Sequence, residues 1–294
     1  MDRAAESTAS QARRRVVITG VSGALGQAIA QLYARRGWHV VGVSRDDSVA
    51  ISGCHRVVHS LQRTAEDAAA LIALEADLTI LCAGQTDVGF HPGGVPDAAE
   101  TESIYRINAL FPALVAIAAA TATRARALDV VAIGTVADGA PSAFAPAYHA
   151  SKVALRYFYA ALAPIARGVS PALRLRVYRP GVIAGPMSEA ALPRLSPRGA
   201  RIRRARCARA PSPEVVAAAL AAFVDSRRLV GTFAEPLTLR TARWLWSHLP
   251  AVHARLHALA WRSGSRFGGP ADASANRGPD TVTRPPRASP TRLG

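Results

Sequence analysis

The 294-residue sequence is long enough for one large α/β domain or two small ones, and half of its residues are hydrophobic. Its formal net charge is +16, and every basic residue is an arginine except one lysine, Lys152. No predicted helix has the dense arginine stripe with interleaved aromatic residues of a nucleic-acid binder, so we expect no nucleic-acid partner. Three widely separated cysteines favour a reducing compartment and argue against a disulfide framework or a zinc site.

The start of the chain has no apolar segment, which argues against a signal peptide, and residues 1–14 are predicted to form a flexible tail. The longest apolar run, residues 109–122, is too short to span a bilayer and is better explained as a buried helix. We therefore expect a cytoplasmic protein without membrane association and without a bound metal.

Hydrophobic periodicity predicts strands and helices that alternate along the chain. Short apolar, mostly β-branched runs predict strands at residues 16–18, 40–43, 56–58, 78–81, 130–133 and 173–178, with a last strand at 233–239. Helical spacing and capping signals predict helices from 25 to a stop at 37, at 64–74, 102–122 and 148–166, and from 213 onward. This alternation predicts a doubly wound parallel sheet of the Rossmann type in a single domain, residues 15–263.

Two segments interrupt this alternation. Residues 193–213 are rich in arginine and proline and are predicted to be too polar for the core. Residues 264–294 have few large apolar side chains and are predicted to be a disordered tail. Between them, residues 245–261 place leucine, valine and tryptophan at helical spacing. We expect this region to pack on the domain, with a pocket cover, a subunit contact or a membrane-surface helix as alternatives.

A glycine-rich turn joins the first strand to the first helix, with the sequence Thr19-Gly20-Val21-Ser22-Gly23-Ala24-Leu25-Gly26. Glycines in this position allow a sharp turn and let a pyrophosphate approach the helix N-terminus, so the turn predicts dinucleotide binding. The second strand ends in Ser44-Arg45 and lacks the acidic residue that often holds the ribose of NAD. Arg45 is placed to pair with a 2′-phosphate, so we expect NADP(H) to be preferred, with NAD(H) as the second option.

Tyr148 and Lys152 are one helical turn apart, so both side chains are expected to point into the same cleft. A free phenol has a pKa of about 10, which is too high for efficient acid–base catalysis at neutral pH. A neighbouring ammonium group stabilises the phenolate, so Lys152 is expected to lower the pKa of Tyr148.

Several motifs occur in the order found in one large enzyme family: Thr19-Gly20-x-x-x-Ala24-x-Gly26, Cys82-Ala83-Gly84, Asn108, Thr135, Tyr148-x-x-x-Lys152 and Pro180-Gly181. From about residue 15 to 239 the chain resembles the short-chain dehydrogenase/reductase family, in its classical branch. The resemblance implies that Tyr148 exchanges the proton, that Lys152 lowers its pKa and binds the nicotinamide ribose, that Thr135 holds the substrate oxygen, and that Asn108 supports a water relay. It implies a cofactor site formed by Thr19, Gly20, Ser22, Gly23, Leu25, Gly26, Ser44, Arg45, Ala83, Gly84, Lys152, Pro180, Gly181 and Ile183.

Three positions depart from the family pattern. Thr135 stands where serine is usual, and its methyl group narrows the pocket. Cys82 replaces the asparagine of Asn-Ala-Gly, and Gly185 stands where a threonine often contacts the carboxamide. These changes leave the proton donor in place but favour slow or narrow activity.

The resemblance implies an NADP(H)-dependent oxidoreductase that interconverts a ketone and a secondary alcohol on a fairly apolar, acyl-thioester or polyketide-like substrate, free or carrier-bound. Residues 182–211 would form a substrate lid whose arginines attract an anionic substrate, or else a solvated loop. The apolar helices that carry Asn108 and Tyr148 imply a homodimer or homotetramer. The alternatives are an NAD-dependent sugar epimerase or dehydratase of the extended branch, which the Gly20-x-x-Gly23-x-x-Gly26 spacing favours, and a cofactor-binding protein with little or no turnover.

Overall fold

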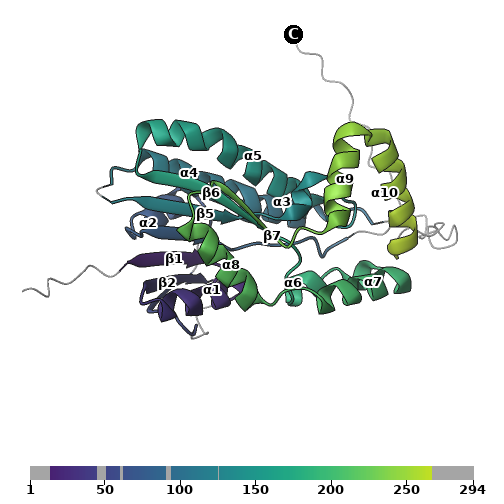
Figure 1. The fold of residues 1–294 in the computed structure, drawn as a ribbon, viewed down its shortest axis with the longest axis horizontal. Coiled ribbons are helices and arrows are strands. Elements are labelled where there is room, and N and C mark those ends of the chain that lie inside the picture. The colour runs from purple at the N-terminus through teal and green to yellow at the C-terminus, as the bar shows by residue number, and fades with distance from the viewer. Residues whose placement is uncertain (1–13, 45–50, 60–61, 91–93, 125, 267–294) are drawn as a thin grey trace, which may run out of the picture.

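The computed structural model of the chain describes residues 14–44, 51–59, 62–90, 94–124 and 126–266. These residues form one parallel sheet of seven strands in the order β3-β2-β1-β4-β5-β6-β7, with helices on both faces (Figure 1). The strands are β1 (Arg15–Thr19), β2 (His39–Ser44), β3 (Arg56–His59), β4 (Leu78–Leu81), β5 (Leu128–Ile133), β6 (Leu173–Pro180) and β7 (Val230–Phe233). The predicted doubly wound sheet is therefore confirmed.

The two faces of the sheet are covered by different helices, because successive side chains of a strand point to opposite sides. On one face, Val16 and Ile18 of β1 belong to the core that includes α1 (Ala24–Arg35) and α8 (Pro213–Asp225). On the other face, Val17 belongs to the core formed with three helices, α2 (Ala65–Ile72), α4 (Phe111–Thr121) and α5 (Pro146–Val169).

Local capping signals end and begin the helices where the sequence predicts. Gly37, with φ of +81°, follows the last turn of α1 in the left-handed conformation that glycine adopts most easily. At the start of α2 the Thr64 hydroxyl accepts a hydrogen bond from the Asp67 backbone N–H at 3.2 Å, and the Asp67 carboxylate accepts one from the Thr64 backbone N–H at 3.0 Å. This reciprocal pair is a capping box.

The helix predicted at residues 102–122 is longer than expected and is not uniform. It consists of α3 (Ala98–Tyr105), a π-helical turn η1 (Arg106–Leu110) and α4. The apolar run 109–122 is the end of a longer helix, and residues 98–121 together are long and apolar enough to cross a membrane by length and composition. Half of its most apolar window is buried inside the fold, which is typical of a core helix.

One other expectation near the C-terminus was wrong, and one segment there has more regular structure than its composition suggests. The strand expected at 233–239 ends at Phe233, and residues 237–248 form helix α9 (Leu237–His248), because the short apolar alternation after Pro236 is also compatible with a helix. The segment 193–213 contains regular structure, namely the end of η3 (Leu192–Arg194) and helix α7 (Pro197–Ala208). The Ser196 hydroxyl caps α7 by accepting from the Gly199 backbone N–H at 3.1 Å.

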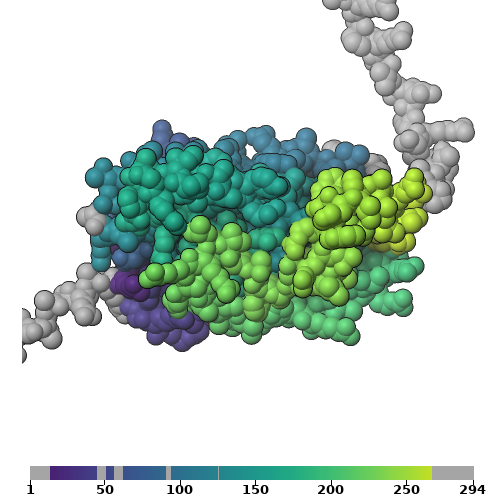
Figure 2. Space-filling view, turned by 45° about the horizontal axis from the view of Figure 1, so that its top comes forward, coloured from purple at the N-terminus to yellow at the C-terminus, as the bar shows by residue number. Residues whose placement is uncertain are grey.

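The last two helices, α9 and α10 (Pro250–Gly264), lie side by side at one end of the molecule, next to α7 (Figure 2). They contact the rest of the domain through η2 (Val136–Gly139) and α7, and they expose large apolar side chains, among them Leu237, Trp244 and Leu259. Residues 264–266 belong to the fold, because Ser265 forms a β-bridge with Leu195, so the tail boundary predicted at 264 was too early. The rest of that tail, and residues 1–13 of the N-terminal one, lie outside the described residues.

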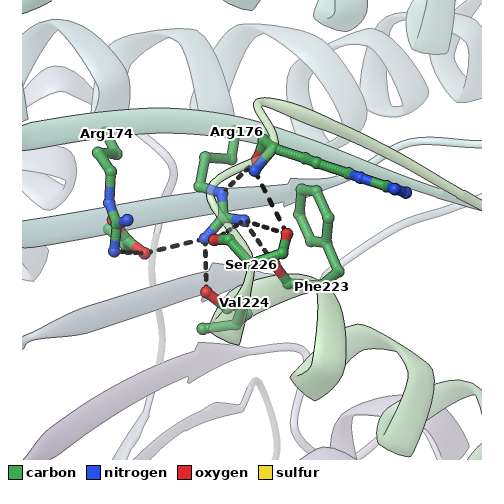
Figure 3. Close-up of polar contacts among 7 residues, drawn as sticks. Arg174, Arg176, Phe223, Val224 and Ser226 are labelled. Carbon is green, nitrogen blue, oxygen red and sulfur yellow. Dashed lines mark hydrogen bonds and ion pairs between the residues drawn. The ribbon is translucent and has the colours of Figure 1, made fainter.

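A buried arginine holds the sheet to α8. Arg176 of β6 is 1% exposed, and its guanidinium donates to Asp129 at 3.1 Å, to the Val224 carbonyl at 2.9 Å and to the Arg228 carbonyl at 2.9 Å. It also donates to the carbonyls of Phe223 and Ser226 at the end of α8 (Figure 3). The last carbonyls of a helix have no partner within the helix, so Arg176 supplies the C-terminal cap of α8.

Candidate active site

The predicted site residues follow five neighbouring strands at the same edge of the sheet. Because the strands are parallel, their carboxyl ends lie together, on the right-hand side of Figure 1. The turn 19–26 follows β1, Ser44 ends β2, Ala83 and Gly84 follow β4, Thr135 follows β5, and Pro180 and Gly181 end β6. The strand order reverses between β1 and β4, which is where open α/β sheets form their ligand crevice.

Two glycines of the turn are required by the fold itself. Gly20 has φ of +69°, and a Cβ there would lie 2.6 Å from the Cα of Ala83. A Cβ at Gly26 would lie 2.3 Å from the carbonyl oxygen of Gly20. The Thr19 hydroxyl accepts a hydrogen bond from the Ala83 backbone N–H at 3.2 Å, which ties the turn to β4.

Two other glycines of the predicted cofactor site are not required by packing, because a Cβ at either position would make only ordinary contacts. A Cβ at Gly23 would meet only the Gly20 carbonyl oxygen, at 3.4 Å, although Gly23 caps the N-terminus of α1. A Cβ at Gly84 would make only ordinary contacts, the nearest with Asn108 at 3.5 Å and with Lys152 Nζ at 3.9 Å. An open helix N-terminus without side chains is a suitable site for a pyrophosphate, so these residues fit the predicted cofactor.

The remaining predicted cofactor residues lie in different surroundings. Ser22 is exposed on the turn, and Ser44 is buried at the end of β2. Leu25 and Ile183 pack against the core beneath the turn. Arg45, on which the preference for NADP(H) depends, lies outside the described residues.

Helix α5 brings the side chains of Tyr148 and Lys152 close together, with Lys152 Nζ 5.9 Å from the centre of the tyrosine ring. The ammonium group donates to the Ile133 carbonyl at 2.7 Å, and burial lowers the pKa of Lys152 to about 8. The expected acidification of the phenol is not found in the protein alone. Burial raises the pKa of Tyr148, and only its hydrogen bond with Thr135 and the charge of Arg203 act in the opposite direction. Tyr148 therefore keeps its proton at neutral pH.

Asn108 lies in the π-helical turn η1 and is fully buried. Its side-chain oxygen accepts from the Gln85 backbone N–H at 2.9 Å, and its amide donates to the Gln85 carbonyl at 2.8 Å and to the Ser151 hydroxyl at 3.1 Å. It thus ties the end of β4 to the helix that carries Tyr148 and Lys152. Single π-turns inside helices are frequent at functional sites.

A buried ion-pair group, which sequence reasoning missed, holds the turn of Thr135. Thr135 begins the short 3-10 helix η2 (Val136–Gly139), in which Asp138 is buried. Asp138 pairs with Arg156 at 2.9 Å and with Arg179, whose Nε also donates to the Thr135 carbonyl at 3.2 Å. A lone aspartate before glycine is typical of an exposed turn, so nothing in the sequence indicates this group.

Asp87 is a second positioning residue that sequence reasoning missed. It is fully buried, and its carboxylate accepts from the backbone N–H groups of Ala147 at 3.0 Å and Tyr148 at 2.9 Å. It therefore caps the N-terminus of α5 from another segment of the chain. The available signal is that α5 begins at Pro146 after Ala145, which has no capping side chain.

The segment predicted to form a lid, residues 182–211, folds as three short helices over this edge. They are α6 (Pro186–Glu189), η3 and α7. Most of its arginines are exposed, but Arg194 is 6% exposed, so the prediction that this segment is too polar to be buried was wrong for this residue. Its guanidinium lies 4.5 Å from the centre of the Phe90 ring.

The sheet order, the glycine turn and the tyrosine–lysine pair define an α/β protein with a dinucleotide-type crevice. The sequence model for short chain dehydrogenase matches residues 14–195, which is more than half of the chain. The chain therefore belongs to the short-chain dehydrogenase/reductase family, and it is an oxidoreductase of that family. None of the curated proteins matches the chain.

Solved structures with the same fold include dehydrogenases from several bacteria and an archaeon. Aldohexose dehydrogenase from Thermoplasma acidophilum is 21% identical with a TM-score of 0.60, over 76% of this chain and 92% of that one. A short chain dehydrogenase from Burkholderia cenocepacia in complex with NADP is 18% identical with a TM-score of 0.63, over 83% and 97%. 3-Oxoacyl-[acyl-carrier protein] reductase from Brucella melitensis in complex with NAD is 19% identical with a TM-score of 0.61, over 77% and 97%. At these identities the similarity shows the fold alone.

Proposed function

We propose that the protein is an NADP(H)-dependent oxidoreductase that interconverts a ketone and a secondary alcohol. The observation that carries the proposal is the Tyr148 phenol, whose pKa is influenced by the Thr135 side chain and whose ring centre lies 5.9 Å from Lys152 Nζ, beside the glycine turn. The glycine turn, the Ala83-Gly84 strand end, Lys152 and Pro180-Gly181 would hold the dinucleotide, which supplies or takes up a hydride when bound.

The residues of the chain would bind the reacting oxygen and move the proton. In the reductive direction, the Thr135 and Tyr148 hydroxyls donate hydrogen bonds to the substrate carbonyl oxygen, which holds it in one place. Because burial keeps the pKa of Tyr148 high, the phenol stays protonated until the substrate oxygen becomes basic enough to take its proton. The Thr135 hydroxyl then stabilises the phenolate that remains. In the oxidative direction the same groups act in reverse.

Cofactor preference is proposed from the sequence at the end of β2. Arg45 follows Ser44 where an NAD-specific site often has an acidic residue. Among structures of the same fold, that from Burkholderia cenocepacia was solved with NADP and that from Burkholderia phymatum with NAD, so the fold accommodates both. Replacing Arg45 by alanine should reduce NADPH affinity by about 10-fold or more, as expected for loss of a charge-assisted pair, and leave NADH affinity unchanged.

A binding measurement followed by an activity assay tests the proposal. NADPH should raise the melting temperature more than NADH, and Gly23→Ala should abolish this rise while the apo protein keeps its own melting temperature. A panel of ketones and acyl thioesters should then show NADPH-dependent reduction that Tyr148→Phe removes without loss of NADPH binding.

Three results would contradict the proposal. If neither dinucleotide binds, the crevice has another use. If NADPH binds but Tyr148→Phe changes nothing measurable, the protein binds the cofactor without turnover. If NAD(H) stays bound through purification and a nucleotide sugar is converted, the epimerase alternative is correct.

A homodimer or homotetramer remains part of the proposal. Helices α4 and α5 expose large apolar side chains on their outer sides, including Ile117, Tyr157, Ile165 and Val169. Sedimentation at several protein concentrations should show an oligomer, and Ile165→Glu should dissociate it. A monomer at all concentrations would contradict this part alone.

A further inference from the structure

Helices α9 and α10 form a helical hairpin that buries almost none of its side chains. Helix α9 has no buried residue, and α10 has one, His253. A surface helix of a globular protein normally buries one apolar stripe, and a large apolar patch left exposed marks an interaction surface. The sequence predicts that this region packs on the domain, yet most of both helices is exposed at one end of the molecule (Figure 2). The hairpin is therefore a candidate interaction surface.

One side of α10 carries four exposed apolar side chains at steps of three, four and three residues. Residues at this spacing lie on one face of a helix. The four are 42% to 59% exposed, and they are Leu249 at the start of the helix, Val252, Leu256 and Leu259. Single exposed leucines are ordinary on a protein surface, but four neighbours on one face form a continuous apolar stripe.

The apolar surface continues from α10 onto α9. A groove of about 430 Å³ lies between the two helices and is lined mainly by apolar side chains, including those of Leu237, Leu245 and Leu256. Leu237 and Leu256 are 73% and 51% exposed, so the groove opens to the surface. Trp244, two helical turns after Leu237, lies on the same side of α9 and is 53% exposed. We call this surface the hairpin face; it comprises Leu237, Trp244, Leu249, Val252, Leu256 and Leu259.

The charged side chains around the hairpin face are all basic. Helices α9 and α10 contain four arginines and no aspartate or glutamate, and α7, which contacts α10, contains five arginines and no carboxylate. Arg240, Arg255 and Arg262 are exposed, whereas Arg243 pairs with Glu235, which precedes α9. An apolar surface bordered by charges of one sign attracts a partner of the opposite sign.

This charge favours an anionic bilayer as the partner. A second copy of the chain would bring arginines against arginines, which costs free energy. Residues 267–294 have four arginines, two aspartates and few large apolar side chains, so they match neither the charge nor the stripe. A bilayer with anionic lipid matches both, because its phosphates attract arginines and its headgroup–acyl boundary takes up leucine and tryptophan side chains.

The helices are suited to lie on a bilayer and not to cross it. They have 12 and 15 residues, whereas about 20 are needed to span the hydrocarbon core. They are fixed to the segment before α5, because the Ala143 backbone N–H donates to His257 at 2.7 Å and the Phe144 ring lies 5.3 Å from that of Trp261. Helix α9 also contacts η2, which follows Thr135. The hairpin face thus lies at the crevice end of the sheet.

We propose that the hairpin face binds peripherally to a bilayer that contains anionic lipid. The leucine stripe and Trp244 enter the headgroup–acyl boundary, and Arg240, Arg255 and Arg262 lie against lipid phosphates. The proposal concerns where the protein acts, and it does not depend on the proposed reaction.

Vesicle flotation with the full chain tests the proposal. Phosphatidylcholine vesicles with about 30% phosphatidylserine should carry the protein in about 0.1 M salt, and vesicles of phosphatidylcholine alone should bind about 10-fold more weakly. Raising the salt to about 0.5 M should remove most of this difference, because salt screens exposed charges. Tryptophan emission should shift to shorter wavelength on binding, and Trp244→Phe should reduce the shift.

A charge placed in the stripe tests which surface binds. The double variant Leu256→Glu/Leu259→Glu should lose vesicle binding, and its melting temperature should stay close to that of the wild type, because both side chains are more than half exposed. Val169→Glu is the matched control. Val169 is 67% exposed at the end of α5, which leads to the opposite edge of the sheet, so this variant should float like the wild type.

Removing charge tests the part that arginine plays. The triple variant Arg240→Gln/Arg255→Gln/Arg262→Gln should bind anionic vesicles about 10-fold or more weakly than the wild type and should bind neutral vesicles equally well. Arg227→Gln, an exposed arginine beyond the end of α8, is the control for loss of a basic residue elsewhere.

Four results would overturn the proposal. They are no flotation of the wild type with anionic vesicles, equal binding to neutral and anionic vesicles, full binding by the double glutamate variant, and flotation only after residues 267–294 are removed. If the wild type does not float and the double glutamate variant turns a dimer into a monomer, the hairpin face is a subunit contact. Tyr148→Phe should float like the wild type, so failure of the proposed reaction and failure of membrane binding are separate results.

Discussion

Two buried arginines of the protein, Arg176 and Arg194, differ in how many hydrogen bonds their guanidinium groups form. Arg176 donates from all three nitrogens to a carboxylate and to the carbonyls that end α8. Arg194 is buried to a similar degree and has no hydrogen-bond partner among the described residues. The same type of side chain is thus fully hydrogen-bonded in one region and buried without a described hydrogen-bond partner in the other.

Lys152 lies between these extremes and extends the comparison. It is buried, and among the described residues its ammonium group donates to one acceptor, the Ile133 carbonyl, so the group is only partly satisfied. Burial lowers the pKa of both Lys152 and Arg176, and for Arg176 the charge of Asp129 and its hydrogen bond act in the opposite direction. The number of hydrogen-bond partners therefore distinguishes Arg176, which stabilises the fold, from Lys152, which retains donors that a ligand could use.

The largest expected effect is a loss of catalytic activity without a loss of stability. Tyr148→Phe should lower kcat by about 10²- to 10⁴-fold, because the general acid is lost. Its melting temperature should stay close to that of the wild type, since Asp87 holds the backbone at this position and not the phenol. Steady-state kinetics and calorimetry on the same preparation check both halves. A large drop in the melting temperature would show that the Tyr148 hydroxyl stabilises the fold and does not serve catalysis alone.

Arg176→Met should have the opposite profile. Breaking a buried ion pair by removing one partner costs about 3–5 kcal/mol of unfolding free energy, because the other charge and the helix carbonyls remain buried. Activity per folded molecule should be retained. Urea unfolding measures the loss, and Arg174→Met, which removes a more exposed partner of the same Asp129, should cost much less. Equal losses would show that burial does not decide the difference.

Lys152 should make stability depend on pH. Its pKa is about 8 in the fold against an ordinary 10.5, so the unfolded chain binds the proton more tightly between these values. Stability therefore rises as pH increases through this window, and below pH 8 the buried ammonium costs about 3 kcal/mol. Lys152→Met should be more stable than the wild type at pH 7, and the gap should close by pH 10. A constant gap would exclude a buried charge at this position.

Asp87→Asn should have the smallest effect. The amide keeps one acceptor for the start of α5 but loses the charge that favours a helix N-terminus, so stability should fall by about 0.5–2 kcal/mol. Because the cap holds the Tyr148 backbone, kcat should fall more than KM rises. Glu66→Gln, at the exposed first turn of α2, is the control for loss of a helix-end charge. Equal effects of the two substitutions on kcat would argue against a positioning role.

The family and most of the fold could be predicted from local sequence. Strands such as β1, with the continuous apolar run 16–18, could be predicted because a parallel sheet is buried on both faces. The cap at Thr64 and the stop at Gly37 depend on neighbouring residues only. Gly20 and Gly26 were predictable for the same reason, since a tight turn before a helix needs them. The short strand expected after Phe233 was wrong, because a few alternating residues do not distinguish a strand from a helix.

The sequence by itself determined the strands of the sheet, the glycine turn and the tyrosine–lysine pair, because each depends on a pattern within a few neighbouring residues. Only the tertiary structure decided that Asp87 caps α5, that Asp138 is buried beside Thr135, and that one arginine of an exposed segment turns inward onto Phe90. The physical reason is that burial and pairing depend on contacts between segments far apart in the chain. The pKa of Tyr148 belongs to the same class, since packing around the phenol raises it and the lysine one turn away does not reverse that effect.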